Sequence, residues 1–177
     1  MIASDTRRWL ERAVIGLNLC PFAKAVHVKG LLHIAVSRAP DAAALLEEVE
    51  AEFAALVSTR ARERETTLLV VPHLLADFFE FNEFTQRCER LIRRRKLEGV
   101  IQLATFHPQY QFAGSEPDDV GNFTNRSPYP ILHFLREESM DRAVEAFPQA
   151  EAIYETNMET MRKLGRDGWD RLMAERP

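Results

Sequence analysis

The chain has 177 residues, a length that suits one domain over 1–177 and argues against two large ones. Apolar residues make up 46% and charged residues 28%, which is a globular composition rather than a disordered one. Lys and Arg number 23 against 27 Asp and Glu, so the net charge is −4. This balance argues against a general nucleic-acid coat, because such domains are usually basic.

The chain also lacks signals for export or membrane insertion. No stretch approaches the ~20 consecutive apolar residues of a membrane span, and the charged N-terminus lacks the apolar core of a signal peptide. Two cysteines, Cys20 and Cys88, are too few for a disulfide framework. We therefore expect a cytoplasmic protein with free thiols and no membrane partner.

Helical and extended patterns alternate in the first half of the chain. Apolar spacing predicts a helix over 5–19 that ends before Pro21, and a second helix that begins at an Asp41 cap. The run 31–36 is typical of a short strand. The run 66–71 is nearly all β-branched or leucine, which predicts a strand covered on both faces.

The second half continues the alternation. The expected elements are a helix over 77–96, strands over 100–106 and 131–136, a helix over 139–147, and a long helix over 148–173. Gly165 and Gly168 should break the last helix. The pattern predicts an α/β fold with a single mixed sheet of about four strands covered by helices, and with C-terminal helices. The first three strands should run parallel, while the direction of the fourth is open.

Residues 107–130, HPQYQFAGSEPDDVGNFTNRSPYP, separate two expected strands and have no helical or strand period. Loops beyond roughly 12–15 residues are uncommon in compact domains and are often functional. Four prolines lie here, and because proline restricts the backbone we expect an ordered loop. The loop is either the wall of a site or a structural lid or homodimer arm.

Two histidines directly follow predicted strands, His73 after one and His107 after the next. Ligands of an open parallel sheet bind beyond the carboxyl ends of its strands, so both imidazoles would face one crevice if these strands are parallel neighbours. The alternative is that both are surface residues. His133 alternates with apolar residues inside a strand, which indicates either a binding residue or a hydrogen-bonded core histidine.

The loop also carries a candidate anion-binding residue. The guanidinium of Arg126 can grip a phosphate or carboxylate, with Asn125 and Ser127 as neutral donors. The alternative is a salt bridge from Arg126 to Asp118 or Asp119 that braces the loop. The two aspartates could also act as a general base, bind a metal or form a turn.

The chemistry of Cys20 depends on which helix end it occupies. At the C-terminus of the first helix, the dipole disfavours a thiolate. If Cys20 instead caps a new turn with Pro21 at its first position, amide dipoles and Lys24 lower the thiol pKa and favour nucleophilic attack. Inert packing is the third alternative, since cysteine is often buried.

Other motifs give little support for a cofactor or a polymeric partner. No close pair of residues has the H-x-x-x-H or C-x-x-C spacing, which argues against a transition-metal site, and the cofactor is left open. Phosphate-binding glycine loops, G-x-S-x-G and H-E-x-x-H are all missing. The basic residues within 87–96 lie at a helix C-terminus, where cations offset the dipole, so nucleic-acid binding is not expected.

Three strings stand out: LNLCPFAK at 17–24, ATFHPQYQFAG at 104–114 and NFTNRSPYPILHFLRE at 122–137. Together they resemble an uncharacterised bacterial family that is classed as a domain of unknown function, in which similar strings occur in this order. The resemblance covers most of the chain. It implies no particular reaction, but it groups Cys20, His107 and Arg126 as one constellation.

These observations lead to two hypotheses of function. The first is a hydrolase- or transferase-like enzyme that acts on a small anionic substrate in a cleft under 107–130, with Cys20 as nucleophile or polar contact. The second is a non-catalytic module that binds a ligand or a protein through the same loop. The candidate catalytic residues are Cys20, His107, Asp118 and Asp119, and the candidate binding residues are His73, Tyr110, Asn122, Asn125, Arg126, Ser127 and His133.

Overall fold

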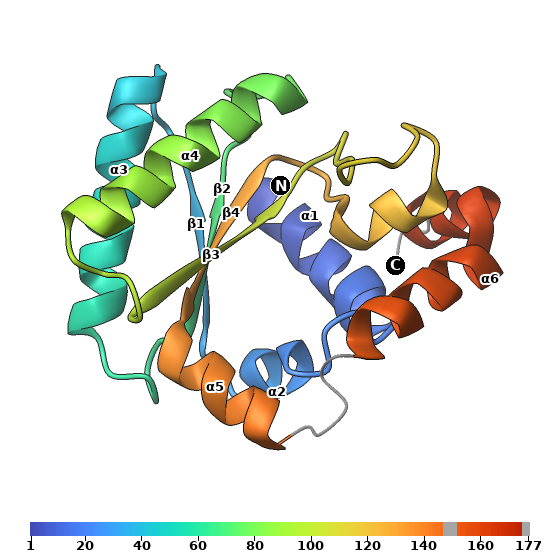
Figure 1. Cartoon of the computed structure of the whole chain (residues 1–177), viewed down its shortest axis with the longest axis horizontal. Coiled ribbons are helices and arrows are strands. Elements are labelled where there is room, and N and C mark those ends of the chain that lie inside the picture. The colour runs from blue at the N-terminus through green and yellow to red at the C-terminus, as the bar shows by residue number, and fades with distance from the viewer. Residues whose placement is uncertain (147–151, 175–177) are drawn as a thin grey trace.

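Four strands form one mixed sheet in the computed structural model, which describes residues 1–146 and 152–174 (Figure 1). The strands are β1 (Leu32–Val36), β2 (Thr66–Val70), β3 (Ile101–Phe106) and β4 (Ile131–Arg136), in the order β1-β2-β4-β3. β1 and β2 pair in parallel, and β4 pairs antiparallel with both β2 and β3. The first three strands therefore share one direction, and the predicted α/β fold with a single mixed sheet is confirmed.

Helices cover both faces of this sheet. They are α1 (Ile2–Trp9), the π-helix η1 (Leu10–Ile15), α2 (Ala23–Val28), α3 (Ala42–Ser58), α4 (Phe78–Arg94), the 3-10 helix η2 (Val120–Asn125), α5 (Glu137–Ala146) and α6 (Ile153–Ala174). Figure 1 shows α3 and α4 on one side of the sheet, with α1, α2 and α6 on the other. None of the helices within the described residues combines the length and the apolar composition that a membrane crossing needs.

Several helix boundaries differ from the predictions. The first helix changes into a π-helix at Leu10, and α2 was not predicted at all. α5 follows β4 directly from Glu137, so Ser139 does not begin it. Gly165 breaks the helical conformation of α6 as expected, with a φ of 64°. The predicted end of α5 at Phe147 and the start of the last helix at 148–151 lie outside the described residues.

The face of the sheet under α3 and α4 is densely packed. Both helices begin at aspartate caps, since Asp41 and Asp77 each accept hydrogen bonds from two backbone N–H groups of the first turn. Phe53 of α3 packs edge-on against Phe134 of β4, with ring centroids 4.8 Å apart. Phe81 of α4 is also fully buried in this core.

The opposite face is packed unevenly. Near α1 and α6 it holds a second core, in which Phe123 of η2 stacks on Trp169 at 5.5 Å and Trp9 is buried. Elsewhere this face is covered by α2 and α5. No side chain of α2 is buried, nor is any described side chain of α5. A cavity therefore lies between the sheet and these two helices.

Candidate functional site

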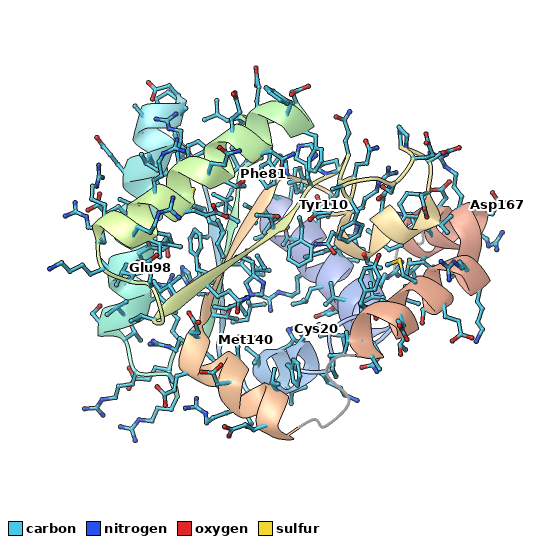
Figure 2. All side chains as sticks on the ribbon, in the orientation of Figure 1. Cys20, Phe81, Glu98, Tyr110, Met140 and Asp167 are labelled. Atoms are coloured by element: carbon cyan, nitrogen blue, oxygen red, sulfur yellow. The ribbon has the colours of Figure 1, made fainter. Side chains whose placement is uncertain are left out.

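The cavity has a volume of about 490 Å³. This size is typical of small-molecule sites, which are mostly apolar and carry a few polar groups. Figure 2 shows Cys20 beside α2 and Met140 on α5, and both belong to the lining. The lining includes Leu10, Val14, Cys20, Lys29, Glu65, Thr66, Leu68, Gln102, Ala104, His133, Arg136 and Ala143.

The floor of the cavity is formed by alternate residues of three strands, because successive side chains of a strand point to opposite faces. His133 of the central strand β4 is paired with Leu68 of β2 on one side and Ala104 of β3 on the other. Ala104 carries only a methyl group, so space remains beside the imidazole. The strand register thus places a histidine at the floor of a mostly apolar cavity.

Thr66 of β2 holds the His133 ring. Its hydroxyl lies 2.7 Å from the backbone carbonyl oxygen of Phe134 and 2.6 Å from Nε2 of His133. Thr66 is buried, so neither contact competes with bulk water. The two hydrogen bonds fix the orientation of the imidazole within the cavity.

His133 is neutral at physiological pH. Burial lowers the pKa of its imidazole from 6.5 to about 4, because the surroundings disfavour the charged form. Nδ1 of His133 makes no hydrogen bond within the described residues. It is also not fully buried, because it is absent from the fully buried side-chain atoms of these residues that lack a hydrogen-bond partner. Nδ1 is therefore accessible from the cavity.

Cys20 lies on the α2 side of the cavity and leads into the turn before that helix. The backbone N–H groups of Phe22 and Ala23 donate toward its sulfur and lower the thiol pKa, but burial outweighs them and the pKa is raised overall. The sequence left open whether Cys20 ends the first helix or begins a new turn. It begins a turn, yet the thiol is not activated there.

Three charged residues, Lys29, Glu65 and Arg136, belong to the lining of the cavity. Lys29 is exposed at the end of α2, and Glu65 precedes β2. The guanidinium of Arg136 donates to the backbone carbonyl oxygens of Leu56 and Thr59. The thiol of Cys20 and the imidazole of His133 are both neutral at pH 7, so the charges of the lining are those of Lys29, Glu65 and Arg136.

His107 lies in a different environment. It is fully buried, and its ring packs between Phe78 and Phe81 at centroid distances of 5.2 and 5.0 Å. Nε2 donates to the carbonyl oxygen of Leu75 at 2.9 Å, and Nδ1 accepts from the backbone N–H of Gln109 at 3.0 Å. Burial lowers its pKa. Both nitrogens are occupied, so this imidazole connects the loop to the segment before α4.

Arg126 braces the loop from within. Its guanidinium donates to the carbonyl oxygens of Pro117, at 2.7 Å, and Tyr110, at 3.4 Å, and lies 4.4 Å from the centroid of the Phe123 ring. Among the described residues, no carboxylate pairs with it. The bracing salt bridge to Asp118 or Asp119 is therefore not formed, and backbone carbonyl groups take its place.

The other polar residues of 107–130 mostly bind the loop to itself. Asn122 is fully buried and accepts from Phe112 N–H and the Ser115 hydroxyl. Asn125 donates to the carbonyl oxygen of Thr105, and the Ser127 hydroxyl donates to that of Tyr129. These bonds account for the conformation of the loop, which is ordered as predicted.

The remaining candidate residues do not belong to the described lining of the cavity. Asp119 caps η2 by accepting from Gly121 N–H at 2.8 Å, while Asp118 is exposed. Tyr110 packs on Phe78 at 5.3 Å. His73 is exposed after β2.

The predicted constellation is thus divided between two places. Cys20 and His133 share the cavity, while the described lining of that cavity includes neither His107 nor Arg126. Arg126 instead borders a separate hollow of about 370 Å³ at the loop. The condition for a crevice shared by His73 and His107 is not met, because β4 lies between their strands.

A family model described as "Protein of unknown function (DUF1415)" matches residues 1–171. The chain belongs to the DUF1415 family. Neither the curated proteins nor the solved structures include a match. The resemblance to an uncharacterised family of unknown function is therefore confirmed.

Sequence reasoning missed the partners of His133 in this DUF1415 chain. Thr66 begins an apolar strand and was not singled out, and its bond to His133 depends on a register that no local pattern contains. The six residues of α2 are short for a periodicity signal. Within the part of the chain that the structure describes, no three His, Cys, Asp or Glu side chains gather as metal ligands.

Proposed function

We propose that the protein binds a small, mostly apolar molecule in the cavity between the sheet and α2 and α5. The observation that carries this proposal is the cavity itself, about 490 Å³ in volume and floored by a histidine with an accessible ring nitrogen. Its size and mostly apolar lining match those of small-molecule sites. This is the ligand-binding alternative from the sequence, placed beside α2 rather than at the loop.

The π-helix η1 gives independent support. π-turns are rare and occur frequently at functional sites. Two residues of η1, Leu10 and Val14, line the cavity. The backbone N–H of Gly16 donates to the carbonyl oxygen of Glu11 at 3.0 Å, a five-residue step that widens the helix beside the cavity. The irregular turn thus coincides with the proposed site.

The enzyme hypothesis has less support from the geometry. It assigns Cys20 the role of nucleophile or polar contact, and burial, which raises the pKa of this thiol, disfavours the nucleophile role. It also needs His107 to move a proton, but both nitrogens of that ring are already bonded inside the fold. The mostly apolar lining of the cavity, which does not include Arg126, likewise favours an apolar ligand over the anionic substrate that Arg126 indicated.

Filling the cavity tests the proposal. Prodan, an uncharged naphthalene dye whose emission shifts to shorter wavelength in apolar surroundings, should bind the wild-type protein saturably at one dye per chain. Ala104→Trp places an indole on the cavity floor, and Ala143→Trp fills the cavity from α5. Each variant should weaken prodan binding about tenfold or more, as measured by fluorescence titration, since the dye and the indole compete for one volume.

The matched control is Ala54→Trp, which adds the same indole at an exposed position of α3 on the other side of the sheet. Its prodan affinity should equal that of the wild type. The proposal is overturned if the wild type does not bind prodan, or if a folded cavity variant binds it as well as the Ala54→Trp control.

A further inference from the structure

The hydrogen bonds of Thr66 determine where the proton of His133 lies. A carbonyl oxygen cannot donate, so the 2.7 Å contact with the Phe134 oxygen requires the hydroxyl proton of Thr66. The hydroxyl has no second proton. The 2.6 Å contact between Thr66 and His133 must therefore be a bond donated by Nε2–H.

A neutral imidazole that carries its proton on Nε2 has a bare nitrogen at Nδ1, which can only accept. The ring of His133 is neutral because burial lowers its pKa to about 4. Nδ1 has no partner within the described residues and is accessible from the cavity. An accessible acceptor on an apolar floor is satisfied by a ligand that brings its own donor.

We propose that the cavity selects an apolar molecule carrying a hydroxyl or N–H group, whose proton Nδ1 of His133 accepts. This inference rests on the proposed function and adds the class of ligand. The apolar body would lie against Leu68 and Ala104, the two residues paired with His133. Molecules of the same shape that offer only an acceptor would meet the Nδ1 lone pair and bind less well.

Two probes with the same ring system separate the donor from the apolar body. 2-Naphthol carries a hydroxyl donor, and 2-methoxynaphthalene carries the same oxygen without a proton. In calorimetric titrations, the wild type should bind 2-naphthol more tightly than 2-methoxynaphthalene. This preference should fall about tenfold in His133→Leu, since Leu retains apolar contact but removes the acceptor. The readout is the ratio of the two affinities, which cancels changes that affect both probes.

His33→Leu is the matched control. His33 is exposed on β1 and is not part of the described lining of the cavity, so this substitution should leave the ratio unchanged. If both probes bind the wild type but the ratio is the same in His133→Leu, the ligand class is overturned while the proposed cavity function stands. If neither probe binds the wild type, the cavity function itself fails.

A spectroscopic measurement keeps the inference testable if His133→Leu does not fold. Proton–nitrogen correlation spectra of the wild type, with its histidines labelled by nitrogen-15, report which ring nitrogen is protonated. We expect a bare Nδ1 at His133 whose resonance shifts with 2-naphthol and not with 2-methoxynaphthalene. A protonated Nδ1, or equal responses to the two probes, overturns the inference.

Discussion

His107 and His133 carry their protons on the same ring nitrogen, yet only one of them can meet a ligand. In both rings Nε2–H donates within the fold, to Leu75 in one case and Thr66 in the other. The difference lies at Nδ1, which accepts from Gln109 in His107 and has no partner among the described residues in His133. Of these two histidines, only His133 therefore has a ring nitrogen that a ligand could contact.

The same burial that keeps His133 neutral suppresses the chemistry of Cys20. The thiolate is the reactive form of cysteine, and a low-dielectric environment disfavours it. The backbone N–H groups of Phe22 and Ala23 act in the opposite direction, because they lower the thiol pKa. The loss of hydration raises the pKa by more, so it is the larger effect. Cys20 thus behaves as a polarizable wall residue at neutral pH.

Alkylation measures this balance directly. In a Cys88→Ala background, the rate of Cys20 modification by iodoacetamide should rise with a midpoint above the ordinary thiol pKa of about 8.5, because burial raises it. A peptide with the sequence of residues 17–23 is the matched control, since it has the same neighbours without the fold. A midpoint at or below that of the peptide would show an activated thiol and revive the nucleophile hypothesis.

At the level of elements, 107–130 is a self-bonded unit rather than a set of groups presented to solvent. Buried Asn122 and the bracing Arg126 direct their donors to backbone carbonyl oxygens of the same loop. Backbone groups of a buried loop need such partners, because no regular ladder satisfies them. Two of the three strings on which the resemblance was based, those in 104–114 and 122–137, therefore contribute to building the loop.

The π-helix η1 depends on a glycine at its end. A Cβ on Gly16 would overlap the backbone carbonyl oxygen of Arg12, and it would also lie 3.2 Å from that of Glu11. Neither atom can move without changing the helix, because both belong to its backbone. The wide turn beside the cavity therefore requires a residue without a side chain.

Gly16→Ala should lower the free energy of unfolding by about 1–3 kcal/mol, the range for forcing an extra methyl group into a packed site. Urea denaturation measures the loss. Gly168→Ala in α6 is the matched control, since the three atoms nearest to its Cβ all belong to the side chain of Leu164 and not to the backbone. The control should lose less stability. Equal losses in the two variants would contradict a special requirement at Gly16.

At the scale of the whole molecule, the two faces of the sheet have different roles. The α3 and α4 face is a closed core that holds Phe53, Phe81 and Phe134. The other face is closed near Trp9 and Trp169, but beneath α2 and α5 it opens into the cavity. Dense packing on one side supplies the rigid sheet against which a more loosely packed pair of helices can admit a ligand.

Hydrogen exchange should detect this asymmetry. We expect amides of α2 and α5 to exchange at least about tenfold faster than those of α3 and α4, because helices without buried side chains open locally at little cost. Saturation with prodan should slow exchange in α2 and α5 and leave α3 unchanged. Protection of α2 and α5 equal to that of α4 would contradict a cavity that opens through them.

Local patterns in the sequence were enough to predict most elements of this protein. The aspartate caps at Asp41 and Asp77, the four strands and the ordered loop follow from side-chain periodicity, capping and proline content. These signals involve residues within a few positions of one another, so they survive without knowledge of the fold. The shared direction of the first three strands also followed, from the helices that connect them.

Only the tertiary structure decided which histidine faces a cavity. The sequence favoured His107, at a strand end, over His133, inside a strand. Contacts across the fold reversed this preference. Leu75 and Gln109 form hydrogen bonds with both ring nitrogens of His107, while Thr66 orients the ring of His133. The insertion of β4 between β2 and β3 is equally non-local, since hydrogen bonding between strands depends on the backbone and leaves little mark in either sequence.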